Sequence, residues 1–208
     1  MDKLTKGVVN FQEQDFEAHR ELFHDLKDEQ RPHTLFIGCS DSRIVPNLIT
    51  QTLPGELFVV RNIANIVPPY RDSEEFLATT STIEYAVNVL HVENIVVCGH
   101  SNCGGCGALH KDPDYFKDIP HVKKWLELSA PARAKALAIL PDGDESELEW
   151  LTEQSNVVEQ MKNLLTYPFI IEKYAAGKIK IFGWYYIIET GEIFNFNPDK
   201  GYFEKISI

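Results

Sequence analysis

The chain has 208 residues, 44% of them hydrophobic, and a formal net charge of −11 at pH 7. This length and apolar content predict a single globular domain over residues 1–208, and no Gly/Ser/Pro-rich linker divides it. The excess of acidic residues argues against a nucleic-acid partner, because such proteins normally present a basic face.

The sequence predicts neither a secretion signal nor a membrane partner. Its first residues turn charged almost at once, and no apolar run is long enough to cross a bilayer. We therefore expect a cytoplasmic protein. In that compartment the four cysteines are expected to be thiols, metal ligands or catalytic groups rather than structural disulfides.

The N-terminal part is expected to form a helical arm over residues 1–32. Residues 11–30 have the composition and spacing of an amphipathic helix, which should end near Pro32. A short apolar run then follows at residues 34–38 and is typical of a buried parallel strand.

Two further apolar runs, at residues 56–60 and 94–99, predict buried strands of the same kind. Between them, residues 73–90 carry apolar side chains at helical spacing. Residues 121–174 are mostly helical in pattern, with a loop at residues 141–144. Alternation of strand and helix indicates an α/β fold with a mostly parallel central sheet flanked by helices.

The C-terminal part changes to the spacing of strands. Residues 178–182 and 184–188 are strand-like, and Thr190-Gly191 predicts a turn into a strand at residues 193–196. An antiparallel hairpin is therefore expected to close the domain.

Two polar segments directly follow predicted buried strands, where parallel sheets form their ligand crevice. Cys39 lies in the first segment, and His100 and Cys103 lie in the second. Thiolate and imidazole are the donors that zinc accepts in tetrahedral sites, and three protein ligands leave one position open. Two thiolates would make the zinc a weaker Lewis acid than three imidazoles do, so activity should rise toward alkaline pH.

Asp41 and Arg43 follow Cys39 on the same turn. A carboxylate there could accept a hydrogen bond from a zinc-bound hydroxide or occupy the open position, and a bidentate arginine could hold it off the metal. The alternative is a simple salt bridge within a turn.

The other two cysteines have simpler explanations. Cys98 fits a small buried core residue. Cys103 and Cys106 form a C-x-x-C pair, which leaves a redox dithiol open as an alternative, although that reading does not explain His100. We expect Cys106 to lie in the core or behind the ligands.

The combination of C-x-D-S-R at residues 39–43 with H-x-x-C at residues 100–103 resembles the beta-class carbonic anhydrases. Further blocks in family order include residues 54–56, 60–65 and 83–86, and the resemblance runs from about Gln30 to Phe196. It implies a lyase that hydrates carbon dioxide reversibly to bicarbonate and a proton by means of a zinc-bound hydroxide.

Carried over by position, the resemblance implies one zinc ion per subunit, held by Cys39, His100 and Cys103. Asp41 and Arg43 would be the catalytic pair. The residues matching the carbon dioxide pocket, part of which is expected from a neighbouring subunit of a homodimer or homotetramer, are Gln30, Phe58, Ile63 and Tyr85.

Within the family, a closed subtype places the aspartate on zinc, and a bicarbonate site formed by Trp, Arg and Tyr can hold it there. Arg61 and Tyr186 match two of these residues, but Phe36 stands where the tryptophan belongs. The indole N–H is missing, so the resemblance favours the open subtype.

Other functions remain open at this point. Carbon disulfide and carbonyl sulfide hydrolases share the same ligands on the same scaffold. A non-catalytic zinc- or bicarbonate-binding protein is a further alternative, although an intact Asp41–Arg43 pair argues against a purely structural metal.

Overall fold

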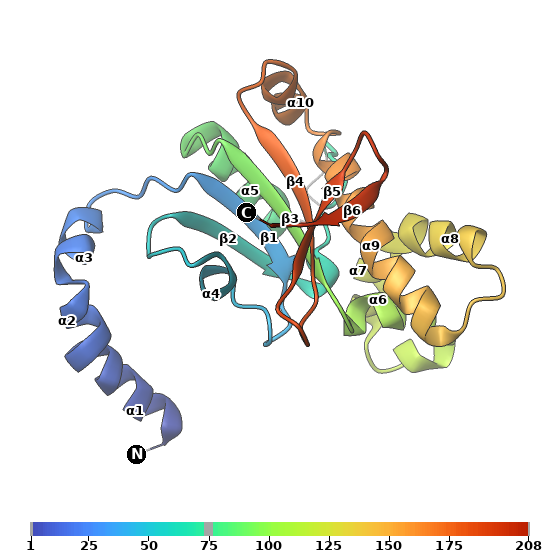
Figure 1. The fold of residues 1–208 in the computed structure, drawn as a ribbon, viewed down its shortest axis with the longest axis horizontal. Helices are drawn as coiled ribbons and strands as arrows, with labels where there is room; N and C mark the ends of the chain where they lie inside the picture. The colour runs from blue at the N-terminus through green and yellow to red at the C-terminus, as the bar shows by residue number, and fades with distance from the viewer. Residues whose placement is uncertain (1, 73–76, 208) are drawn as a thin grey trace.

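A six-stranded sheet forms the centre of the molecule (Figure 1), in a computed structural model that describes residues 2–72 and 77–207. The strand order is β2-β1-β3-β4-β5-β6. The bounds are β1 (Thr34–Cys39), β2 (Leu57–Asn62), β3 (Asn94–His100), β4 (Lys180–Tyr186), β5 (Ile193–Asn197) and β6 (Tyr202–Lys205).

The four strands β2, β1, β3 and β4 pair in parallel, and β5 and β6 add antiparallel pairs. The predicted α/β class, parallel sheet and C-terminal hairpin are therefore confirmed. The two runs predicted at residues 178–182 and 184–188 are one strand that continues through Gly183, and β6 was not predicted. A Cβ atom at Gly183 would lie 2.3 Å from the Met161 sulfur, so glycine lets a helix pack directly on the strand.

Helices flank the sheet, and most were predicted. The helical stretch at residues 73–90 corresponds to α5 (Leu77–Glu84) and a π-helical turn, Tyr85–Val89, while residues 73–76 lie outside the described residues. The short α4 (Pro46–Thr50) and α6 (Gly104–Ala108) were missed because neither spans two helical turns. The C-terminal helices are α7 (Pro120–Leu126), α8 (Ala130–Ile139), α9 (Glu145–Leu164) and α10 (Pro168–Ala175).

The N-terminal arm stands away from the sheet (Figure 1). It contains α1 (Lys3–Asn10), α2 (Phe16–Ala18) and α3 (Arg20–Leu26), with a π-helical stretch between the first two. The predicted helix at residues 11–30 was placed too late, because Asp2 caps the N-terminus by accepting a 2.8 Å hydrogen bond from the Thr5 amide.

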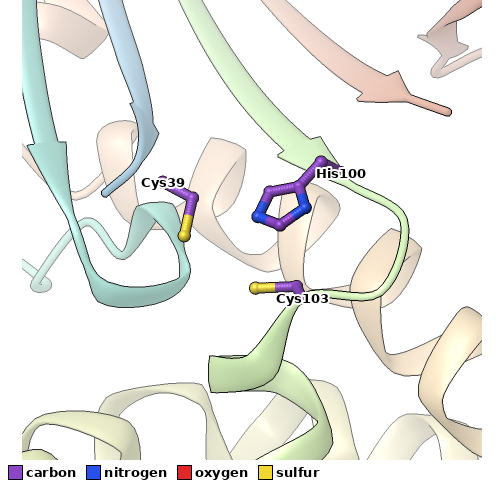
Figure 2. A group of neighbouring side chains, drawn as sticks. All are labelled: Cys39, His100 and Cys103. Atoms are coloured by element: carbon purple, nitrogen blue, oxygen red, sulfur yellow. The ribbon is translucent and has the colours of Figure 1, made fainter. Parts of the chain in front are cut away.

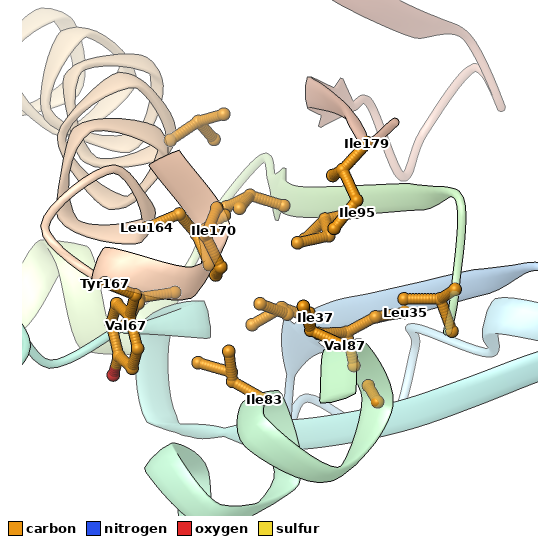
Figure 3. Close-up of a cluster of buried hydrophobic side chains, with 14 residues drawn as sticks. Leu35, Ile37, Val67, Ile83, Val87, Ile95, Leu164, Tyr167, Ile170 and Ile179 are labelled. Carbon is orange, nitrogen blue, oxygen red and sulfur yellow. The ribbon is translucent and has the colours of Figure 1, made fainter. Parts of the chain in front are cut away.

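The main core lies on one face of the sheet (Figure 3). Leu35 and Ile37 of β1 and Ile95 of β3 face side chains from α5, α9 and α10 there. Alternate residues such as Phe36 point to the opposite face, where they form a smaller cluster with Val96 and Cys98, and Ile49 of α4 packs against it. Alternation along the strands thus gives the sheet two apolar faces, of which the second has the thinner cover.

Among the described residues, no helix combines the length and the apolar character needed to cross a membrane. The longest, α9, carries charged residues along its length and packs on β3 and β4.

Candidate metal centre

Three side chains converge at the carboxyl ends of neighbouring strands. Cys39 ends β1, His100 ends β3, and Cys103 caps the start of α6. Their sulfur and nitrogen donor atoms all lie within 4.8 Å of one another, and all three residues are buried. Figure 2 shows the two thiols and the imidazole turned toward a common point. The parallel register of β1 and β3 creates this convergence, because it brings residues 61 positions apart in the chain to one edge of the sheet.

The donors suit a zinc ion. The Nδ1 atom of His100 lies 3.0 Å from the Ser101 carbonyl oxygen, so it carries the proton and leaves a lone pair on Nε2. That Nε2 atom is buried and has no hydrogen-bond partner among the residues that the structure describes. Tetrahedral zinc with Zn–S bonds of about 2.3 Å needs sulfur atoms about 3.8 Å apart. This separation is within the 4.8 Å limit on the distances between the donor atoms.

The thiols need a cation to ionise. The adjacent Cys103 thiol and burial raise the pKa of Cys39 to about 12, and contact with Cys106 together with burial raises the pKa of Cys103. Both groups therefore keep their protons near neutral pH unless a metal displaces them.

Asp41 lies beside the three converging donors, and Arg43 holds its carboxylate in place. The guanidinium donates two hydrogen bonds to the carboxylate, at 2.9 Å from Nε and 2.7 Å from Nη2, and a third to the Asn102 carbonyl. These contacts hold the pKa of Asp41 well below its ordinary range. One Asp41 oxygen is 3.9 Å from His100 Nε2, so an ionised carboxylate faces the donor group without occupying its centre.

Arg61 matches one residue of the family's bicarbonate site, a site that the sequence does not complete, and its side chain binds the backbone of the loop after β1. It donates to the carbonyl oxygens of Cys39 at 2.9 Å and Asp41 at 2.6 Å. Phe36 is fully buried and packs edge-on against Trp184, with 6.3 Å between the ring centroids. The two Arg61 hydrogen bonds thus support the turn that carries Cys39 and Asp41.

A pocket of about 310 Å³ opens beside Cys39 and Asp41. Its walls are mainly small and apolar, and a carbon dioxide molecule needs no more space than this. The remaining lining residues are Ser40, Ile63, Gly104, Gly105, Ala108, Tyr115 and Val122.

Of the four predicted pocket residues, the chain brings only Ile63 to this pocket. Phe58 stacks on Tyr85 at 5.8 Å and pairs in register with Leu35. It therefore lies about 13 Å along the strand direction from Cys39, at about 3.3 Å per residue. Gln30 is more distant, since it precedes β1 at the opposite end of the strand.

The other two cysteines lie in apolar surroundings. Cys98 packs with Phe36 and Val96, as predicted, and Cys106 lies in a cluster with Cys39 and Cys103. None of the four cysteines forms a disulfide.

The sequence did not predict a buried carboxylate that lies behind the three converging donors. Glu153 of α9 accepts a 2.7 Å hydrogen bond from the Cys103 amide, and burial raises its pKa to about 7. It lies in an acidic helix, where a glutamate usually faces water, so no sequence signal marked it.

Comparison with known proteins agrees with this geometry. The sequence model of the family described as carbonic anhydrase matches residues 34–193. A carbonic anhydrase of Helicobacter pylori (strain ATCC 700392 / 26695) is 45% identical over 208 residues, covering 98% of this chain and 94% of the relative. One from Synechococcus elongatus is 40% identical and covers 93% of this chain and 70% of the relative.

Comparison with solved structures identifies the class of carbonic anhydrase. The beta-carbonic anhydrase CcaA superposes with a TM-score of 0.94 at 37% identity, covering 99% of this chain and 92% of the other. A tetrameric beta-carbonic anhydrase of Sordaria macrospora superposes with a TM-score of 0.82 at 33% identity, covering 92% and 94%. The chain therefore belongs to the beta-class carbonic anhydrases, a family of lyases. These matches favour carbon dioxide over the carbon disulfide alternative.

Proposed function

We propose that this protein catalyses the zinc-dependent, reversible hydration of carbon dioxide to bicarbonate and a proton. The observation that carries the proposal is the convergence of Cys39, His100 and Cys103 beside the Asp41–Arg43 pair, in a chain of the carbonic anhydrase family. The three converging residues are assigned as ligands of one zinc ion per subunit.

When bound, zinc supplies a Lewis acid that lets water act as a nucleophile near neutral pH. Asp41 accepts a hydrogen bond from that water and orients it toward carbon dioxide. Arg43 fixes the carboxylate through its two side-chain contacts. Ile63 and Val122 supply apolar walls that hold the substrate next to the nucleophile.

We further propose that the site is of the open subtype, because Asp41 is held by Arg43 and Phe36 provides no indole N–H. On zinc-loaded protein we expect carbon dioxide hydration at both ends of a range from about pH 6.5 to 9, with rates rising toward alkaline pH. Stopped-flow measurement with a pH indicator checks this. Activity only above about pH 8 would mean that Asp41 occupies the fourth position.

The same assay separates the alternative substrates. Turnover of carbon dioxide should greatly exceed turnover of carbonyl sulfide on the same zinc-loaded sample. A preference for carbonyl sulfide would contradict the proposed activity, and the absence of both would favour a non-catalytic zinc protein.

We propose that residues 1–208 form one domain and that the arm packs on a second copy of the chain. Leu4, Val8 and Phe11 are 81%, 54% and 44% exposed and recur at helical spacing along the arm. A groove of about 440 Å³ on the thinly covered sheet face, lined partly by Phe182 and Trp184, offers an apolar surface of the matching kind.

Assembly would also complete the substrate pocket. Three of the predicted pocket residues lie too far from the proposed metal ligands of the same subunit to contact them, namely Gln30, Phe58 and Tyr85. Their predicted role therefore requires the metal centre of a neighbouring subunit. Homodimers and homotetramers both meet this requirement, and the Sordaria relative is tetrameric.

Introducing charge on the apolar side of the arm tests the assembly. We expect a Leu4→Asp, Val8→Asp double variant to fall from a dimer or tetramer to the 23.7 kDa monomer in light scattering, with a loss of turnover. Lys6→Asp, on the other side of the same helix, is the matched control and should stay assembled. A monomeric wild type, or a double variant that remains assembled, would contradict the proposal.

A further inference from the structure

Helix α9 buries a polar side, which is unusual for a helix packed on a sheet. Its buried polar residues are Thr152, Glu153, Ser155, Asn156, Gln160 and Asn163. Burying a polar group costs free energy unless the group finds hydrogen-bond partners. The hydrogen bonds of these side chains therefore indicate which loops α9 holds in place.

The carboxyl-terminal half of this polar side binds the loop after β2. Asn156 donates to the Ala64 carbonyl at 2.8 Å, and Gln160 accepts from the Val67 amide at 2.9 Å. Asn163 donates to the Val67 carbonyl at 2.9 Å. Ala64 needs this support, because its φ of 60° is in the left-handed region that disfavours a side chain.

Glu153 binds the other loop, the one that carries two of the proposed metal ligands. Its Oε1 accepts the Cys103 amide at 2.7 Å, and its Oε2 accepts the Tyr185 hydroxyl at 2.6 Å. Glu153 is 2% exposed and Tyr185 is 3% exposed, so water cannot replace either partner. Both oxygens of the carboxylate are thus committed to protein donors.

The loop between His100 and Cys103 has other supports, since Arg43 donates to the Asn102 carbonyl and the Ser101 hydroxyl accepts the Ile188 amide, but neither bond reaches the Cys103 amide. Asn102 has a φ of 54°, and Ser101 is tied to the strand end by its amide, which donates to the Tyr186 carbonyl at 2.9 Å. The Cys103 amide lies at the start of α6, where an unpaired N–H has no partner within its helix. Glu153 supplies that partner and so fixes the backbone from which the Cys103 thiol projects.

We propose that Glu153 is a positioning residue for the metal centre: through the Cys103 amide and the Tyr185 hydroxyl it sets the direction in which Cys103 presents its sulfur. The inference rests on the zinc site proposed above. Glu153 binds no metal itself, since its oxygens face the backbone and the tyrosine. It acts as a carboxylate behind a ligand does in other zinc sites, where such partners change metal affinity by about 10- to 100-fold.

The variants separate hydrogen bonding from charge. Glu153→Ala leaves two buried donors unpaired. Glu153→Gln keeps an acceptor for the Cys103 amide and can donate its amide to the Tyr185 oxygen. Glu153→Asp keeps the charge but withdraws the carboxylate by one methylene. Asn163→Ala is the matched control, because Asn163 lies on the same side of α9 but binds the Val67 loop.

Zinc release into a chromogenic chelator is the main readout, with the visible absorption of the cobalt-substituted protein as the second. We expect release from Glu153→Ala and Glu153→Asp to be about 10-fold faster than from wild type or more, with a changed cobalt spectrum. Glu153→Gln should stay within about threefold of wild type, and Asn163→Ala should release zinc at the wild-type rate.

Wild-type release rates and spectra in Glu153→Ala would overturn the inference. If that variant does not fold, the same result in Glu153→Asp would overturn it. Release from Glu153→Gln as fast as from Glu153→Asp would also overturn it, because charge rather than hydrogen-bond geometry would then matter. Wild-type protein that binds no zinc would instead refute the proposed metal site.

Discussion

Replacing Cys103 by alanine is expected to abolish stoichiometric zinc binding and reduce carbon dioxide hydration to the buffer background. Two donors, Cys39 and His100, would remain, and one of the two thiolates that neutralise the metal would be lost. Because even groups that only support a ligand change affinity by about 10- to 100-fold, loss of a ligand should weaken binding by more than 100-fold. Metal analysis after dialysis against a chelator measures the effect.

The control for this experiment lies three residues away. Cys106 is also buried, at 1% exposure, but is not among the three converging donors. Cys106→Ala makes the same chemical change and should keep both zinc and turnover. Full zinc content in Cys103→Ala would contradict the ligand assignment, whereas loss of activity in Cys106→Ala with zinc retained would revive the redox-dithiol interpretation.

Replacing Asp41 by alanine is expected to separate metal binding from catalysis. The carboxylate lies next to the donor group and does not belong to it, so zinc content should remain at one ion per subunit. Turnover should fall by roughly 100-fold or more, which is typical for the loss of a group that orients or accepts a proton. Stopped-flow hydration and metal analysis on the same sample provide both quantities.

An exposed aspartate outside the pocket serves as the comparison. Asp118→Ala removes the same carboxylate and should leave turnover unchanged. Asp41→Ala with wild-type turnover would show that the pair with Arg43 is only a salt bridge within a turn. Loss of zinc from Asp41→Ala would mean that the carboxylate itself contributes to metal binding.

Local sequence patterns predicted the parallel part of the sheet well. The runs at residues 34–38, 56–60 and 94–99 became β1, β2 and β3 with small changes at their ends. β1 and β3 are buried as predicted, because both faces of a central parallel strand are covered. The predicted burial of β2 was wrong, because β2 is the edge strand of the sheet and Val59 is 38% exposed. The turn at Gly191 was equally readable, and its φ of 75° explains the glycine.

Local patterns failed where short elements depend on contacts distant in sequence. α6 spans only Gly104–Ala108, and a Cβ atom at Gly105 would lie 2.9 Å from the Ala64 side chain. Its glycines therefore serve close packing against another loop, although in the sequence they resemble a flexible segment. The start of the helix predicted at residues 11–30 was wrong for a different, local reason, because the Asp2 side chain caps a helix that begins at Lys3.

The sequence by itself singled out the proposed metal donors and the acidic group beside them, because Cys39, Asp41, His100 and Cys103 stand in short motifs whose chemistry is readable without a structure. Only the tertiary structure decided how these groups are held. Register between β1 and β3 brings the donors together, Arg43 restrains Asp41, and Glu153 supports Cys103 from behind. The physical reason is that a buried polar side chain is defined by its partners, and partners 50 residues apart leave no local pattern.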